Sequence, residues 1–294
     1  MANLGFVGLG VMGGRLAKRL LDAGHRVTGY NRTGSRAGWL VGHGLRLVPT
    51  PREVAEAAEV TFGMVSDAEA LRAVTEGPDG VLAGLRPDRV YVEMSTVGPL
   101  VVEDLAVRLA EAGAHLVEAP VMGTVATLER GKLDVVMLSG DPAACERVRP
   151  FVEELGRKVV YVGTTGKAML LKSGVNLSLP VQMAALAEGL LLAEKAGIPR
   201  EVALEVMRAS PTTSQATANR LPFLPELPAQ PWFDVRMMQK DLELALERGH
   251  ALGVPMPLTA AANQLLTACR GLGYEKDDFA ALYHVLARLA GMDR

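Results

Sequence analysis

The chain has 294 residues, of which 49% are hydrophobic and 22% charged, with a formal net charge of −2. This length suffices for two domains and a substantial core, and the near-neutral, interspersed charges give no electrostatic reason to expect nucleic acid or an anionic membrane as a partner. Two cysteines, Cys145 and Cys269, are too few for a disulfide framework and indicate reduced thiols.

Two features bear on location. A strand-like run begins directly after the N-terminus, so we expect no targeting segment and a cytoplasmic protein. The most apolar stretch, residues 175–193, is nearly long enough to span a membrane, but polar residues and a proline interrupt it. We therefore interpret it as a buried helix.

The first motif is a glycine turn between a strand-like run and a helical pattern. Residues 4–7 are apolar, and residues 11–23 have helical apolar spacing. Between them, Gly8 permits a tight turn, Gly10 permits close approach of a pyrophosphate, and Gly13 permits close packing of helix on strand. A helix N-terminus also offers free N–H groups to an anion. The motif alone is weak evidence, but its context predicts a dinucleotide site.

The end of the second expected strand, residues 25–30, bears on which dinucleotide binds. NAD sites place an acidic residue about 20 positions after the glycines, whereas this chain has Asn31, Arg32 and Thr33 there. Because arginine can bind a 2′-phosphate through charge-assisted hydrogen bonds, we predict NADP, with NAD as the alternative. Arg32 as a solvated surface charge is the competing interpretation.

Strand-like and helix-like segments then alternate, which predicts a parallel sheet covered on both faces. Ligands bind such sheets beyond the carboxyl ends of the strands, so the turns at 64–67, 95–99 and 119–124 are candidate site loops. Further strands are expected at 45–48, 60–65, 89–93, 115–118, 134–139 and 158–162, and helices at 35–42, 51–58, 68–74, 101–112 and 142–155.

Past Gly163 every periodic segment is helical, so we predict a domain boundary there, with domains at 1–163 and 164–294. The first helix, 166–196, would link them. Lys172 and Asn176 are spaced i, i+4 and emerge from one face of it. A snorkelling lysine and a core amide are the alternative.

Three further expectations concern the helical part. Pro180 removes the N–H that would bond the Asn176 carbonyl, which predicts a kink between them. The proline-rich stretch 211–231 is expected to be a connector, with a loop that covers a site as the alternative. Helices are expected after it at 234–252, 258–270 and 277–289. Lys240 is either a functional cation or a surface charge paired with Asp241. The five histidines lack metal-ligand spacing, so no metal is expected.

Taken together, five segments of the sequence resemble the beta-hydroxyacid dehydrogenase family, and the resemblance covers essentially the whole chain. Within this family the segments are most similar to those of 3-hydroxyisobutyrate dehydrogenases and their glyoxylate/succinic semialdehyde reductase relatives. The matching segments, in order, are residues 8–13 (GLGVMG), 93–99 (EMSTVGP), 118–133 (EAPV through GKL), 163–176 (GTTG with Lys172 and Asn176) and 233–242 (through KDL).

Two positions depart from the family pattern. Met122 stands where the family commonly has a serine, so one hydroxyl donor for a substrate carboxylate is missing. Val175, before Asn176, matches the glyoxylate reductase branch, whereas 3-hydroxyisobutyrate enzymes usually have an asparagine there. These departures leave the substrate open.

The resemblance implies a role for each matching position. Lys172 would exchange a proton with the substrate hydroxyl, and Asn176 would orient Lys172 or the substrate oxygen. For Lys172 to act near neutral pH, burial and Lys240 would have to lower its pKa. The implied cofactor-binding residues are Gly8, Gly10, Val11, Met12, Gly13, Asn31, Arg32, Thr33, Val65, Ser66, Thr96 and Lys240. The implied substrate-binding residues are Ser95, Gly123, Thr124, Lys172, Asn176, Lys240 and Asp241.

The resemblance implies a Rossmann α/β domain joined by a long helix to an all-α domain. It also implies hydride transfer between NAD(P) and a small beta-hydroxy acid, with 3-hydroxyisobutyrate favoured. Glyoxylate or succinic semialdehyde reduction is the alternative enzyme, and a dinucleotide-binding sensor or scaffold without catalysis is the alternative class. Lys172 argues against the sensor and against imine reductases, which often replace that lysine. Exposed apolar residues of the helical part predict a homo-oligomer, a dimer or tetramer.

Overall fold

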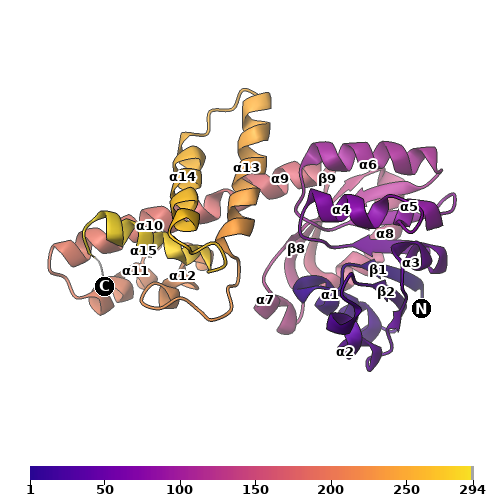
Figure 1. Cartoon of the computed structure of the whole chain (residues 1–294), viewed down its shortest axis with the longest axis horizontal. Helices are drawn as coiled ribbons and strands as arrows, with labels where there is room; N and C mark the ends of the chain where they lie inside the picture. The colour runs from indigo at the N-terminus through magenta and orange to yellow at the C-terminus, as the bar shows by residue number, and fades with distance from the viewer. Residues whose placement is uncertain (293–294) are drawn as a thin grey trace. The chain divides into compact units, whose positions relative to one another are not determined.

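The computed structural model describes residues 1–292. Its contacts divide the chain into two compact units, Met1–Lys172 and Ser173–Arg294. The first unit contains all the strands of the described chain and the second contains helices (Figure 1). This confirms the predicted fold class, an α/β dinucleotide-binding fold followed by an all-α part.

One sheet forms the centre of the first unit, with strand order β3-β2-β1-β4-β5-β6-β8-β7 and β9 paired to β8. Neighbours from β3 to β6 run parallel. The strands are β1 (Asn3–Val7), β2 (Arg26–Tyr30), β3 (Arg46–Leu47), β4 (Val60–Gly63), β5 (Val90–Glu93), β6 (His115–Glu118), β7 (Val121–Met122), β8 (Leu133–Gly140) and β9 (Gly156–Gly163).

The prediction of a wholly parallel sheet is wrong at β8, which runs antiparallel to both β6 and β7. A parallel pair requires a long crossover, usually a helix of several turns. The connection from β7 to β8 contains only α7 (Val125–Glu129), a five-residue helix that begins with a capping box between Thr124 and Thr127. The chain therefore turns back alongside β7. The 14-residue helix α8 (Pro142–Leu155) then provides a true crossover, and β9 is parallel to β8.

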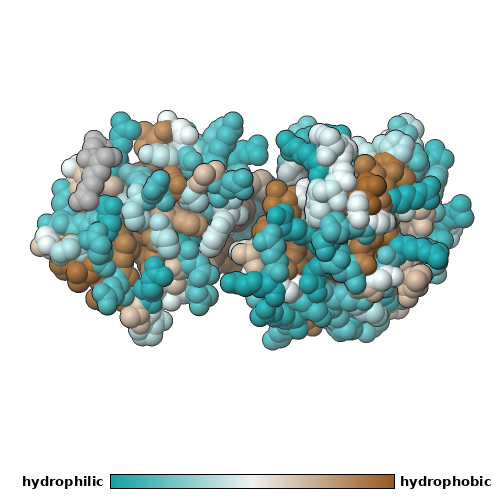
Figure 2. Space-filling view, turned by 90° about the horizontal axis from the view of Figure 1, so that it is seen from below, coloured by the Kyte–Doolittle hydropathy of each residue, from teal (hydrophilic) through white to brown (hydrophobic). Residues whose placement is uncertain are grey.

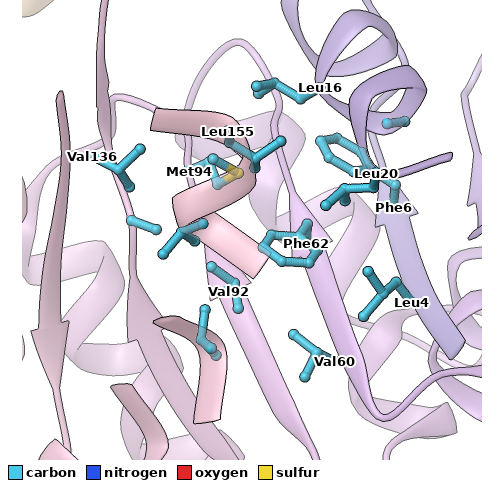
Figure 3. Close-up of a cluster of buried hydrophobic side chains, with 14 of the residues drawn as sticks. Leu4, Phe6, Leu16, Leu20, Val60, Phe62, Val92, Met94, Val136 and Leu155 are labelled. Atoms are coloured by element: carbon cyan, nitrogen blue, oxygen red, sulfur yellow. The ribbon is translucent and has the colours of Figure 1, made fainter. Parts of the chain in front are cut away.

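Helices cover both faces of the sheet because successive strand residues point to opposite sides. Val90 and Val92 of β5 belong to one buried cluster, whereas Tyr91 between them belongs to another. Figure 3 shows the first cluster, in which Leu16 and Leu20 pack near Phe6 and Phe62. The other helical segments of this unit are α1 (Val11–Asp22), η1 (Gly34–Ala37), α2 (Gly38–Val41), α3 (Pro51–Ala57), α4 (Ala68–Thr75), α5 (Val81–Gly84) and α6 (Pro99–Glu111).

The predicted long helix is interrupted. Helix α9 (Lys167–Asn176), which contains the division between the units, ends one residue before α10 (Ser178–Lys195). The break at Leu177 lies within the stretch where Pro180 predicts a kink. By length and composition alone Lys167–Lys195 could cross a membrane, a property shared by core helices of water-soluble proteins; 39% of its most apolar window is buried.

In the second unit, α13 (Val235–Ala251) packs against α14 (Pro257–Gly271), and α10 packs against α15 (Leu282–Leu289). Helix α11 (Arg200–Ala209) is not among the predicted helices, and the expected connector 211–231 is not a plain loop. That stretch contains α12 (Gln215–Ala218) and η2 (Leu221–Phe223), and η3 (Phe279–Ala281) precedes α15.

The connector is structured because Arg220 is buried with Asp278. Their ion pair measures 3.1 Å, and the Asp278 carboxylate also accepts the Trp232 and Phe233 N–H groups. Hydrophobic side chains reach the surface of both units in patches between hydrophilic ones (Figure 2).

Candidate functional site

The glycine turn after β1 is tightly packed at two of its three positions. Gly8 has φ +92°, and a Cβ there would lie 2.2 Å from the Met64 carbonyl oxygen. A Cβ on Gly13 would lie 2.0 Å from the Gly8 carbonyl oxygen. These two glycines therefore bring α1 close to the sheet.

Gly10 differs, because no atom lies within 4 Å of the position its Cβ would occupy. It is the N-cap of α1, whose first N–H groups, including those of Val11 and Met12, lack acceptors within the helix. The Val11 side chain is exposed, whereas Met12 packs against the core. Open space beside these N–H groups has room for a pyrophosphate, so the geometry of this turn is compatible with a bound dinucleotide.

The residues after β2 form the rim of the same turn. Asn31 accepts the Leu9 N–H at 3.2 Å and donates to the Thr33 carbonyl at 2.9 Å, so its amide holds the two loops together. Arg32 and Thr33 are exposed.

Arg36, in η1 and four residues after Arg32, is not among the predicted site residues. Arg36 is exposed and lines a hollow of about 490 Å³ together with Gly10 and Trp39. The sequence feature that could have indicated Arg36 is a second arginine only four positions after Arg32. Two exposed cations beside the glycine turn make this rim suited to a phosphate.

The loops after β4 and β5 are joined through Ser95. Its hydroxyl oxygen accepts the Val65 N–H at 2.8 Å, and its own N–H donates to the Glu93 carboxylate at 2.7 Å. Ser95 is buried, so its contacts within the protein brace these loops. Thr96 is half-buried, and the exposed Ser66 donates to Asp67, the N-cap of α4.

Two buried carboxylates at the ends of β5 and β6 were not predicted. Glu93 and Glu118 are both fully buried and are register partners on adjacent strands. Burial raises the pKa of Glu93 to about 7, and the nearby Glu118 contributes in the same direction. Burial also raises the pKa of Glu118. Each ends an apolar strand, a place where nothing in the local pattern marks a residue as interior.

Lys172 lies on α9 and is 9% exposed. Its Nζ donates to the Val121 carbonyl at 2.8 Å and lies 3.5 Å from the Met122 sulfur. The position that departs from the family pattern thus contacts the predicted catalytic lysine. The next two residues shape the turn into α7. Gly123 has φ +140°, and the Thr124 hydroxyl caps the helix.

In the second unit, Asp241 joins the other predicted polar residues. It is 1% exposed and accepts from the Asn176 amide at 2.6 Å, and it lies 3.1 Å from the Lys240 Nζ. Asn176 is buried as well. The structure therefore brings Asn176, Lys240 and Asp241 together, with Asp241 as the shared partner.

Comparison with known proteins matches both parts of the chain. Residues 3–163 match the family model for the NAD-binding domain of 6-phosphogluconate dehydrogenase. Residues 166–286 match the model for the NAD-binding domain of NADP-dependent 3-hydroxyisobutyrate dehydrogenase.

Individual relatives match almost the whole chain. Human cytokine-like nuclear factor N-PAC is 34% identical over 96% of this chain, which spans about half (51%) of that protein's length. The chloroplastic glyoxylate/succinic semialdehyde reductase 2 of Arabidopsis thaliana is 32% identical over 97% of this chain and 79% of its own. The crystal structure of 3-hydroxyisobutyrate dehydrogenase from Salmonella typhimurium has a TM-score of 0.88 at 28% identity, covering 97% of this chain and all of that one.

Proposed function

The chain belongs to the beta-hydroxyacid dehydrogenase family, and we propose that it transfers a hydride between NADP and a small beta-hydroxy acid, with 3-hydroxyisobutyrate as the leading substrate. The observation that carries the proposal is the buried side chain of Lys172, whose Nζ donates to the Val121 carbonyl of β7. A buried amine is costly unless it is hydrogen-bonded, and here the Val121 carbonyl accepts a hydrogen bond from it.

The cofactor assignment rests on the rim of the glycine turn. Gly10 leaves room for the pyrophosphate, and Arg32 and Arg36 supply two cations where an NAD site would have a carboxylate. We propose that both arginines bind the 2′-phosphate, and that Val65, Ser66 and Thr96 lie along the nicotinamide ribose. Residues 1–163 are proposed to bind the cofactor, and residues 164–294 are proposed as the domain for substrate binding and oligomerisation.

The bound nicotinamide supplies the hydride chemistry. When the hydroxy acid is oxidised, the carbon loses a hydride and the hydroxyl loses a proton to the neutral amine form of Lys172; in the reverse direction the Lys172 ammonium returns that proton. The Gly123 N–H would hold the substrate carboxylate, with Ser95 bracing the neighbouring loop; Thr124, which bonds Thr127 through both its N–H and its hydroxyl, would fix the start of α7 beside it. Asn176 and Lys240, held by Asp241, are proposed to act on substrate and cofactor.

The second candidate is reduction of glyoxylate or succinic semialdehyde. It is favoured by the 32% identity to the Arabidopsis reductase and by Val175 before Asn176. Initial rates with 3-hydroxyisobutyrate, serine, glycerate and succinic semialdehyde, each with NADP(H) and NAD(H), separate the two.

A sensor or scaffold without catalysis is tested by Lys172→Ala. We expect this variant to bind NADPH normally and to lose at least about 99% of turnover, because general acid–base catalysis contributes ~10²-fold or more. Turnover above about a tenth of wild type would contradict the role of Lys172. If no substrate in the screen is turned over by the wild type, the catalytic proposal itself fails.

We also propose a cytoplasmic homo-oligomer. Leu192, Val202 and Val206 are exposed on α10 and α11, an apolar surface that a second copy would cover. Sedimentation equilibrium tests this, and a single 31.2 kDa species would contradict it.

A further inference from the structure

The Glu118 carboxylate, at the end of β6, holds the start of α9. It accepts hydrogen bonds from the Gly166 N–H, from the Met169 N–H at 3.0 Å and from the Ser139 hydroxyl at 2.7 Å. The Ser139 oxygen in turn accepts the Ala168 N–H at 3.1 Å. The first N–H groups of a helix lack acceptors within it, and negative charge there is stabilising. Glu118 thus binds this helix end directly and through Ser139.

The turn before α9 is shaped for these bonds. Gly166 has φ +87°, and a Cβ there would lie 2.5 Å from a carboxylate oxygen of Glu103. A larger residue would therefore be strained in its backbone, and the Glu103 side chain would have to move aside. The N–H that Glu118 accepts is thus presented by a turn whose positive φ favours glycine.

The Glu118 carboxylate is connected to the donor and to the acceptor of the hydrogen bond between Lys172 and Val121. On one side, Lys172 follows Met169 by three residues in α9, less than one turn. On the other side, the Val121 carbonyl that accepts from Lys172 Nζ lies three residues after Glu118 in the chain. Movement of α9 relative to the end of β6 would therefore change the position of the ammonium.

We propose that Glu118 is a positioning residue for Lys172: it fixes the start of α9 to the end of β6 and so sets where the Lys172 Nζ lies beside strand β7. This inference rests on the proposed acid–base role of Lys172. Glu118 does not exchange the proton itself, because its oxygens are used by α9 and Ser139.

The decisive variant is Glu118→Gln, which keeps the side-chain volume but replaces one acceptor oxygen by an NH2 donor. A displacement of about 1 Å can lower turnover by ~10²-fold. With NADP and the acid ranked first in the rate screen, we expect kcat to fall by about 10- to 100-fold. The Kd for NADPH should stay within about twofold. Unchanged kcat in a folded Glu118→Gln protein would overturn the proposal.

A matched control is Asp141→Ala, which removes the capping carboxylate of α8 in the same unit. Loss of this N-cap should lower the melting temperature and leave kcat within about twofold of wild type. If Asp141→Ala lowers kcat as much as Glu118→Gln does, the effect is a general loss of stability and the proposal is wrong.

The double variant Glu118→Gln/Lys172→Ala shows whether Glu118 acts through Lys172. We expect it to retain the residual turnover of Lys172→Ala within about twofold, because a misplaced lysine matters only when the lysine is present. A further loss of tenfold or more would overturn the proposal. High turnover of Lys172→Ala alone would instead contradict the proposed function, so the two failures are distinguishable.

If Glu118→Gln does not fold, as judged by its melting curve, Ser139→Ala tests the same connection. It removes the hydroxyl that links Glu118 to Ala168 and leaves the carboxylate in place. We expect a smaller loss of kcat, about three- to tenfold, again at constant NADPH affinity. No loss of kcat in this variant would overturn the proposal.

Discussion

Glu93 and Glu118 occupy the same register position on neighbouring strands, and both carboxylates are fully buried. The two have different partners: Glu93 accepts from Tyr91 and Ser95, whereas Glu118 accepts from α9 and Ser139. One carboxylate therefore holds the loop after its own strand, and the other holds the helix that carries Lys172.

The raised pKa of Glu93 predicts a pH-dependent stability. Its pKa is about 7 in the folded protein and 4.5 for an ordinary glutamate, so the folded state binds the extra proton between these values. The contribution of Glu93 to the free energy of unfolding is therefore fully present below about pH 4.5 and is lost as the pH rises to about 7. The maximum loss is about 3 kcal/mol in the free energy of unfolding.

Glu93→Gln removes this titration, since glutamine resembles the protonated acid. Urea unfolding at pH 5 and pH 8 should show wild type losing stability relative to Glu93→Gln as the pH rises. A constant difference between the two proteins at both pH values would contradict the assignment.

Alanine variants at two glycines of the first turn should have different effects, one on the stability of the fold and the other on NADPH binding. Gly13→Ala places a Cβ 2.0 Å from the Gly8 carbonyl oxygen, so we expect a loss of about 1–3 kcal/mol in the free energy of unfolding. Gly10→Ala has open space and should unfold like wild type. It should nevertheless bind NADPH at least tenfold more weakly in a fluorescence titration, because the methyl group occupies the pyrophosphate side. Normal NADPH affinity in Gly10→Ala would argue against the dinucleotide lying there.

Variants of the two arginines after β2 should show whether these residues favour NADP over NAD. A hydrogen bond to a charged group contributes about 1.5–3 kcal/mol, so Arg32→Ala or Arg36→Ala should raise the KM for NADP by at least about tenfold. The KM for NAD should change by less than twofold. Arg26→Ala, an exposed arginine at the opposite end of β2, is the control and should alter neither value. Equal losses with both cofactors would contradict 2′-phosphate recognition.

Met122→Ser tests the departure from the family pattern. Serine supplies the hydroxyl donor that methionine lacks, so we expect a lower KM for carboxylate substrates with kcat little changed. Met122→Leu keeps the apolar bulk without sulfur and should leave that KM close to wild type. If Met122→Ser and Met122→Leu give the same KM, the hydroxyl at this position does not contact the substrate.

The local elements were predictable because their signals are local. The 142–155 helix has the predicted bounds, and the strands from β1 to β6 lie within two residues of their expected ends. The antiparallel strand β8 was not predictable from alternation, since its direction depends on the short α7 connection. Likewise, α11 was missed although Pro199 precedes a regular apolar pattern.

The residue pattern predicts an α/β fold with a glycine turn, a following helical part, and Lys172 and Asn176 one turn apart. These are properties of periodicity, glycine conformation and helix geometry, which act over a few residues. The bond from Lys172 to Val121 and the contact of Glu118 with α9 are visible only in the folded chain, because these partners are 51 and 48 residues apart. No local pattern marks a buried carboxylate whose acceptor role depends on a helix packed against it.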